Sequence, residues 1–86
     1  EEAVTRQELA VILAGYAASC QIELPEGDIV FPDAESISPW AQKSVNVMAA
    51  RGIIQGREDG RFDGQGQATR AEFAVMLNRF LPLMQQ

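Results

Sequence analysis

The sequence contains no histidine, so it lacks both the most frequent general base of enzymes and the most frequent ligand of protein-bound zinc. It has one cysteine, Cys20, which excludes an internal disulfide. Because Cys20 follows an apolar stretch with helical spacing, we expect it to be a buried small residue rather than a nucleophile. No apolar run approaches the roughly 20 residues that a membrane-crossing helix needs, so we expect no transmembrane segment.

The chain is also poor in positive charge. Seven basic residues, of which Lys43 is the only lysine, stand against 12 acidic residues and give a net charge of −5. So few cations cannot neutralise many phosphates, and we expect no nucleic-acid partner.

The chain is short for an enzyme, since its 86 residues are fewer than the roughly 100 to 200 of a typical catalytic domain. No set of nucleophile, base and metal ligand can be assembled from it, so we predict a module that is not an enzyme and needs no cofactor. The sequence starts without methionine or a signal peptide, and we expect it to be a piece of a longer, exported protein.

The sequence repeats itself at an offset of 64 residues, because TRQELAVIL at residues 5–13 returns as TRAEFAVML at residues 69–77 with six of nine positions identical. Thr followed three residues later by Glu is typical of a capping box, in which each side chain accepts a backbone N–H of the first helical turn. We therefore predict that a helix begins in each copy. The predicted structural caps of these two helices are Glu8 and Glu72, whose partners in the capping boxes are Thr5 and Thr69.

Apolar side chains recur at helical spacing after each capping box. The expected buried faces are Leu9, Ile12, Leu13, Tyr16 and Cys20 in the first helix, and Phe73, Met76, Leu77, Phe80, Leu81 and Met84 in the last. A helix is also expected between them, with Ser38 as its N-cap, Pro39 at its first position and Gly52 as its stop. Its predicted inner face is Ala41, Val45, Met48 and Ala49.

Two loops complete the expected fold. Residues 21–37 are predicted to be a connector tucked against the helices. Residues 52–68 hold five glycines, and only Ile53, Ile54 and Phe62 could anchor them to the core. The sequence therefore predicts an all-α fold: a small helical bundle of three main helices with two structured loops and little or no sheet.

Five short motifs follow one another along the chain. They are Phe31-Pro32-Asp33, Trp40-Ala41, Gly52-Ile53-Ile54-Gln55-Gly56, Gly60-Arg61-Phe62 and Thr69-Arg70-Ala71-Glu72-Phe73-Ala74. In order and spacing they resemble a repeat of the S-layer homology (SLH) family, and residues 5–18 resemble the closing helix of a preceding repeat. The resemblance divides the chain into a closing helix at 1–20, a connector at 21–28 and one full SLH repeat at 29–86.

The resemblance implies an extracellular module of the bacterial cell surface that tethers a larger protein to the cell wall. In the family the ligand is typically an anionic, often pyruvylated, secondary cell-wall polysaccharide, which binds in grooves between neighbouring repeats. The family commonly combines three repeats, so further SLH repeats or copies of this chain are expected partners. The arginine of the Thr-Arg-x-Glu signature contributes to such grooves, and by resemblance this role falls to Arg6 and Arg70.

The residues give a separate reason to consider these arginines. A helix start carries unpaired N–H groups and a partial positive charge, and an arginine at the first position adds a planar fork that suits a carboxylate. Thr5-Arg6 and Thr69-Arg70 both supply this arrangement, so the candidate contacts with an anionic group of the polymer are Arg6, Arg70, Thr5 and Thr69. In the alternative, Thr and Glu only cap the helix while the arginine pairs with a nearby acid. The residues alone favour this alternative, whereas the resemblance favours ligand binding.

Two further residues are possible sugar contacts. Trp40 could stack on a sugar ring, although packing is the more frequent role of a tryptophan in the first turn of an amphipathic helix. Gly56 could present a backbone N–H to a ligand, and its alternative is a tight structural turn. The acidic loop at residues 58–63 does not fit a calcium loop, because positions one, three and twelve would not be carboxylates, so no metal site is predicted.

The competing hypothesis for function is a protein interaction or oligomerisation module completed by partner chains. Wall binding would depend on Arg6 or Arg70. Self-association would depend on apolar residues such as Phe80 and Met84.

Overall fold

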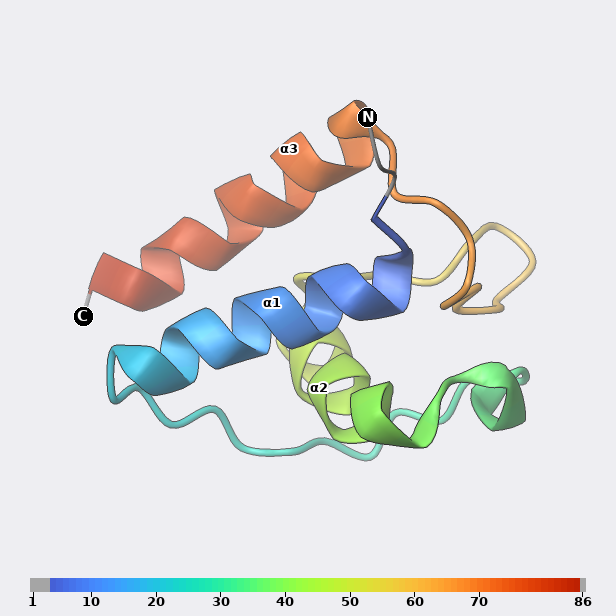
Figure 1. The fold of residues 1–86 in the computed structure, drawn as a ribbon, viewed down its shortest axis with the longest axis horizontal. Coiled ribbons are helices and arrows are strands. Elements are labelled where there is room, and N and C mark those ends of the chain that lie inside the picture. Colours follow the sequence, from blue (N-terminus) through green and yellow to red (C-terminus); the bar gives the residue numbers. More distant parts are fainter. Residues whose placement is uncertain (1–3, 86) are drawn as a thin grey trace.

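The structure is a computed structural model that describes residues 4–85. Its three α-helices are α1 (Arg6–Ser19), α2 (Pro39–Ala50) and α3 (Arg70–Phe80), joined by two long loops (Figure 1). Two 3-10 helices, η1 (Ala34–Ser36) and η2 (Leu81–Gln85), complete the elements. In this part of the chain, β-pairing is limited to one isolated antiparallel bridge between Thr5 and Gln67, so the all-α prediction is confirmed. None of the described helices is long and apolar enough to cross a bilayer.

Both predicted capping boxes are present. Thr5 Oγ1 accepts the Glu8 N–H at 3.2 Å, and Glu8 Oε1 accepts the Thr5 N–H at 2.8 Å. Thr69 and Glu72 make the same two bonds at 3.1 and 2.9 Å. The repeat in the sequence therefore corresponds to two helix starts with the same local structure.

α2 starts and ends close to the predicted positions, but Ser38 does not cap it as predicted. Ser38 holds the N-cap position without a side-chain capping bond. Instead its Oγ accepts Gln7 Nε2, and its N–H donates to Gln7 Oε1, both at 3.0 Å. At the other end Gly52 has φ 73°, and the Ile53 N–H donates to Met48 O at 3.0 Å, which confirms the predicted glycine stop.

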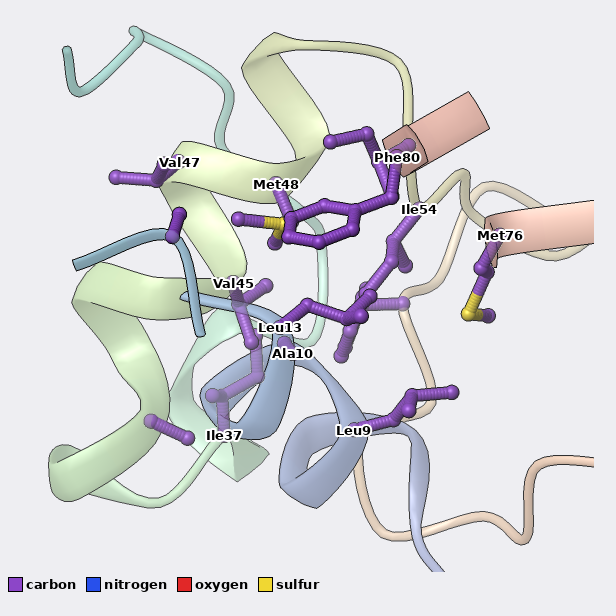
Figure 2. Close-up of a cluster of buried hydrophobic side chains, with 14 residues drawn as sticks. Leu9, Ala10, Leu13, Ile37, Val45, Val47, Met48, Ile54, Met76 and Phe80 are labelled. Carbon is purple, nitrogen blue, oxygen red and sulfur yellow. The ribbon is translucent and has the colours of Figure 1, made fainter. Parts of the chain in front are cut away.

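The core lies where the three helices and the glycine-rich loop (residues 52–68) face one another. Figure 2 shows side chains from α1, α2 and α3 meeting there. The loop anchors Ile53, Ile54 and Phe62 are fully buried, as predicted. The predicted inner face of α2 is confirmed, since its members Ala41, Val45, Met48 and Ala49 are all buried.

The predicted buried faces of α1 and α3 are only partly correct. Of the residues predicted for the first helix, Leu9 and Leu13 are buried, whereas Ile12, Tyr16 and Cys20, which follows α1, are exposed. Of those predicted for the last helix, Met76 and Phe80 are buried and Leu77 and Met84 are half-buried. Phe73 and Leu81, the first residue of η2, are exposed. Each helix therefore has two apolar edges and packs one of them here.

The expectation that Cys20 is buried is wrong, because α1 ends at Ser19 and the backbone turns away at Gln21 with φ 61°. Phe80 is buried and Met84 packs against the core, in line with their place on the predicted inner face of the last helix. The self-association hypothesis therefore gains no exposed apolar surface at these two residues.

The segment Phe31-Pro32-Asp33 fastens the glycine-rich loop. The rings of Phe31 and Phe62 pack with their centroids 5.1 Å apart. The Asp33 carboxylate accepts the backbone N–H groups of Phe62 and Asp63, both at 2.9 Å. Burial acts to raise the pKa of Asp33, but these bonds outweigh it, and the pKa lies below its ordinary value. The ionised carboxylate therefore holds the loop where Asp63 adopts φ 58°.

We predict that Asp33→Asn lowers the free energy of unfolding by about 2 kcal/mol, because an amide retains one acceptor oxygen and loses a bond of the charged kind, which contributes about 1.5–3 kcal/mol. Urea denaturation measures the change. Asp28→Asn is the matched control, since Asp28 is exposed and the charge change is the same. Equal effects of the two substitutions would contradict this role of Asp33.

Candidate functional site

A groove of about 810 Å³ lies between the glycine-rich loop and one side of α3. Residues 53–63 and 71–79 supply its walls, and Arg6 of α1 reaches it from a third segment. The charged residues that line it are Arg6, Arg57, Arg61, Arg79, Glu58, Asp59, Asp63 and Glu72. With four bases and four acids, the groove offers hydrogen-bond donors and acceptors together and has no net charge.

Arg6 connects the three segments that form the groove. Its side chain is only 3% exposed. Its Nε donates to Phe62 O at 2.9 Å, Nη2 to Gln55 O at 2.6 Å and Nη1 to Glu72 Oε2 at 2.7 Å. The guanidinium also lies 5.1 Å from the Phe62 ring centroid, within cation–π range. Burial, followed by the charge of Arg57, lowers the pKa of Arg6, but an arginine keeps its proton in a protein. Arg6 therefore fixes the shape of the groove from inside.

The first turn of α1 is bonded to the end of the glycine-rich loop. The N–H groups of Arg6 and Gln7 donate to Gly66 O and Gly64 O, both at 2.9 Å. The Glu8 N–H donates to Thr5 Oγ1, and the Thr5 N–H donates to Glu8 Oε1. All four N–H groups that a helix start leaves unpaired are thus used within the protein. These N–H groups are not open to an anion, and Arg6 pairs with an acid in this structure. Contact of Thr5 and Arg6 with a ligand stays a prediction.

Glu72 is that acid, and it has a second partner. Its Oε2 accepts Arg57 Nη1 at 2.7 Å as well as Arg6. Burial acts to raise the pKa of Glu72, but the Thr69 N–H and the charges of Arg57 and Arg6 outweigh it, so the pKa is lowered. Arg57 also bonds Asp63 at 3.2 Å. Sequence reasoning missed Arg57, for which the only signal was its place in the glycine-rich loop.

Two arginines of the groove face solvent. Arg79 is exposed and has no ion-pair partner among the residues that the structure describes. Arg61 pairs with Asp59 at 2.8 Å, and both side chains are more than half exposed. These two guanidinium groups can therefore reach a ligand in the groove, whereas that of Arg6 cannot do so without breaking its internal bonds.

Of the predicted sugar contacts, Gly56 lies in the groove and Trp40 does not. A Cβ at Gly56 would lie 3.2 Å from the carbonyl oxygens of Gly60 and Arg61, so a close turn explains this glycine. Trp40 is 60% exposed, and the expectation that it packs is wrong. Its stacking on a sugar stays a prediction.

Of the second Thr-Arg-x-Glu signature, residues 69–72, only Ala71 and Glu72 line the groove. Thr69 caps α3, and Arg70 is exposed and does not line the groove. A ligand-binding role for Arg70 stays a prediction. Within residues 4–85, no three acidic or thiol side chains are placed to hold a metal ion.

The part of the chain that supplies most of the groove also identifies the protein family. A model of the S-layer homology domain matches residues 30–74, which is more than half of the chain. The chain belongs to the S-layer homology family. Its SLH match runs from the segment before η1, through α2 and the glycine-rich loop, into the first turn of α3.

Proteins with similar sequences are far longer than this SLH chain. The surface-layer 125 kDa protein of Lysinibacillus sphaericus is 36% identical over 88% of the chain, and an amylopullulanase of Thermoanaerobacterium thermosulfurigenes is 35% identical over 88%. A cellulosome-anchoring protein of Acetivibrio thermocellus is 29% identical over 94%. The chain spans only 6%, 4% and 18% of these relatives. No solved structure is significantly similar to it.

We predict that Arg6→Met lowers the free energy of unfolding by about 3–5 kcal/mol, because it leaves the Phe62 and Gln55 carbonyls without their donor and removes one of the two arginines that bond Glu72. Arg70→Met is the matched control at the repeated position. Because Arg70 is exposed, its substitution should cost about 0.5 kcal/mol or less. Chemical denaturation measures both, and a similar loss in the two variants would contradict a structural role specific to Arg6.

Proposed function

We propose that this SLH chain is a non-catalytic module that attaches a larger protein to a bacterial cell wall by binding an anionic wall polysaccharide in the groove beside α3. The observation that carries the proposal is the groove itself. Its walls are joined by the buried guanidinium of Arg6, and it presents the exposed guanidinium groups of Arg61 and Arg79 to solvent.

The relatives support the anchoring part of this proposal. One is named as a surface-layer protein and another as a cellulosome-anchoring protein, so the module acts at the bacterial surface, outside the cytoplasm. The match to the amylopullulanase covers 4% of that enzyme, which is too short a segment to contain a catalytic domain. The shared segment is then an attachment region rather than the source of activity.

The chemistry of the groove suits a charged saccharide. Guanidinium groups bind carboxylates through paired, charge-assisted hydrogen bonds, which fits a pyruvate ketal or another acid on the polymer. Sugar hydroxyl groups donate and accept, and the exposed carboxylates of Glu58 and Asp59 supply acceptors beside the arginines. A groove with both signs of charge can therefore bind a polyhydroxylated chain and select for an acidic one.

The arginines have different roles in this proposal. Arg6 shapes the groove, whereas Arg61 and Arg79 contact the ligand. Arg70 and Trp40 lie outside the groove lining and are proposed as further contacts for a long polymer. Each such contact raises the effective concentration of the next one.

The test is co-sedimentation of the chain with wall sacculi that carry their secondary polymer and with sacculi stripped of it. Binding is expected only to the first. The double variant Arg61→Ala/Arg79→Ala should bind at least about tenfold more weakly, since a hydrogen bond to a charged group contributes about 1.5–3 kcal/mol.

The matched control is Lys43→Ala/Arg51→Ala, which makes the same change in net charge at exposed positions outside the groove. It should bind nearly as well as the unmodified chain. Equal losses in the two double variants would mean that net charge, rather than the groove, determines binding. Equal binding to intact and stripped sacculi would contradict the polysaccharide ligand.

A further inference from the structure

A second groove, of about 290 Å³, shares no lining residue with the groove beside α3. It lies between the connector (residues 21–37) and α2. The connector supplies Ile29, Val30, Phe31 and Ile37, and α2 supplies Val45 and Asn46. Sites that enclose a whole small molecule have about 300–1,000 Å³, so this mainly apolar groove suits the side chains of a larger partner.

The groove is preformed, because the amide of Asn46 fastens the connector to α2. Its Oδ1 accepts the Gly27 N–H at 2.7 Å, and its Nδ2 donates to Ile29 O at 2.9 Å. A Cβ at Gly27 would overlap the Cβ of Ala50, so the connector backbone lies directly on α2. A partner therefore binds a surface whose shape is already fixed, which lowers the entropy cost of binding.

The outer side of the connector has unpaired backbone groups. Residues 22–31 form no helix, turn, bend or bridge, so the chain is extended here (Figure 1). The bonds from α2 engage residues 27 and 29, and the N–H and carbonyl groups of successive residues point to opposite sides of an extended chain. Those of Asp28 and Val30 therefore face away from α2, and they form no hydrogen bond within residues 4–85. The Val30 side chain is 82% exposed.

The segment that borders this groove also carries the net charge of the chain. Residues 21–37 contain five acidic residues and no basic one, whereas the other seven acids of the chain are balanced by its seven bases. Glu23, Glu26, Asp28 and Glu35 are exposed, and none of them forms an ion pair in the part of the chain that the structure describes. A positively charged partner is therefore attracted to this surface.

We infer that this second groove is the docking site for a basic, extended segment of another protein. The apolar walls and Val30 accept the apolar side chains of the segment, and the acidic border selects lysine or arginine beside them. The free backbone groups of Asp28 and Val30 pair with the backbone of the segment, as when a strand is added to an exposed edge. The site goes beyond the proposed polysaccharide binding and does not depend on it.

The probe for this site is a short, fluorescently labelled peptide of alternating lysine and valine, and fluorescence polarisation measures its binding to the chain. Saturable binding is expected. Peptides of alternating glutamate and valine, and of alternating lysine and serine, should bind at least about tenfold more weakly, because each lacks one of the two recognised features.

Val30→Ser should weaken binding of the lysine–valine peptide at least about fivefold, because it removes apolar contact area. Ile12→Ser is the matched control, since it changes an exposed apolar residue that does not line the second groove. It should leave the affinity unchanged. Because both side chains are exposed, both variants should fold.

Hydrogen exchange measured by NMR then locates the bound peptide. The N–H groups of Asp28 and Val30 should exchange at least about tenfold more slowly in the complex, whereas that of Ile29, which faces α2, should change less. Equal binding of the three peptides, equal losses in the two variants, or unchanged exchange at Asp28 and Val30 would overturn the inference. So would a dimer of the chain that Val30→Ser dissociates, because it would assign the groove to a second copy.

Discussion

The burial of the Arg6 guanidinium is the interaction on which the groove depends. One side chain binds the backbone of the glycine-rich loop at Gln55 and Phe62 and the carboxylate of Glu72 at the start of α3. Arg6 thus joins α1 to residues that lie 49 to 66 positions away in the sequence. Glu72 joins the same three segments from α3, because its carboxylate accepts both Arg6 and Arg57. A charge taken out of water is stable only when its donors are satisfied, so the loop and α3 must keep the positions that satisfy Arg6. The shape of the groove follows from this constraint.

The Thr-Arg-x-Glu signature combines a helix cap with an arginine, and only the cap has the same surroundings in both copies. In Thr-Arg-x-Glu, the Thr and Glu cap the helix in both copies, as local chemistry dictates. The arginine is buried in the first copy and exposed in the second. In the proposed function a ligand meets the groove through Arg61 and Arg79, which the signature does not contain, while Arg6 and the closed helix start behind them support the groove.

Features set by neighbours in the sequence could be predicted, and features set by distant contacts could not. The capping boxes, the glycine stop at Gly52 and the loop anchors depend on residues a few positions apart, and they were predicted correctly. The bonds of Ser38 to Gln7 and of Arg57 to Glu72 join separate segments, and no local sequence pattern predicts them. Helical spacing identified the apolar positions of α1 and α3, but the choice of the buried edge depends on what packs against each helix. This is why Ile12, Tyr16, Phe73 and Leu81 were predicted to be buried but are exposed.

The central claim is that Arg6 builds the groove and the exposed arginines bind the ligand. The most direct measurement is an NMR titration of the arginine Nε–H signals with a soluble fragment of the acidic wall polysaccharide. The account predicts that the signals of Arg61 and Arg79 shift as the fragment is added, while the Arg6 Nε–H, bonded to Phe62 O, stays in place and exchanges slowly with water. Unshifted Arg61 and Arg79 signals, or a rapidly exchanging Arg6 Nε–H that moves with ligand, would contradict it.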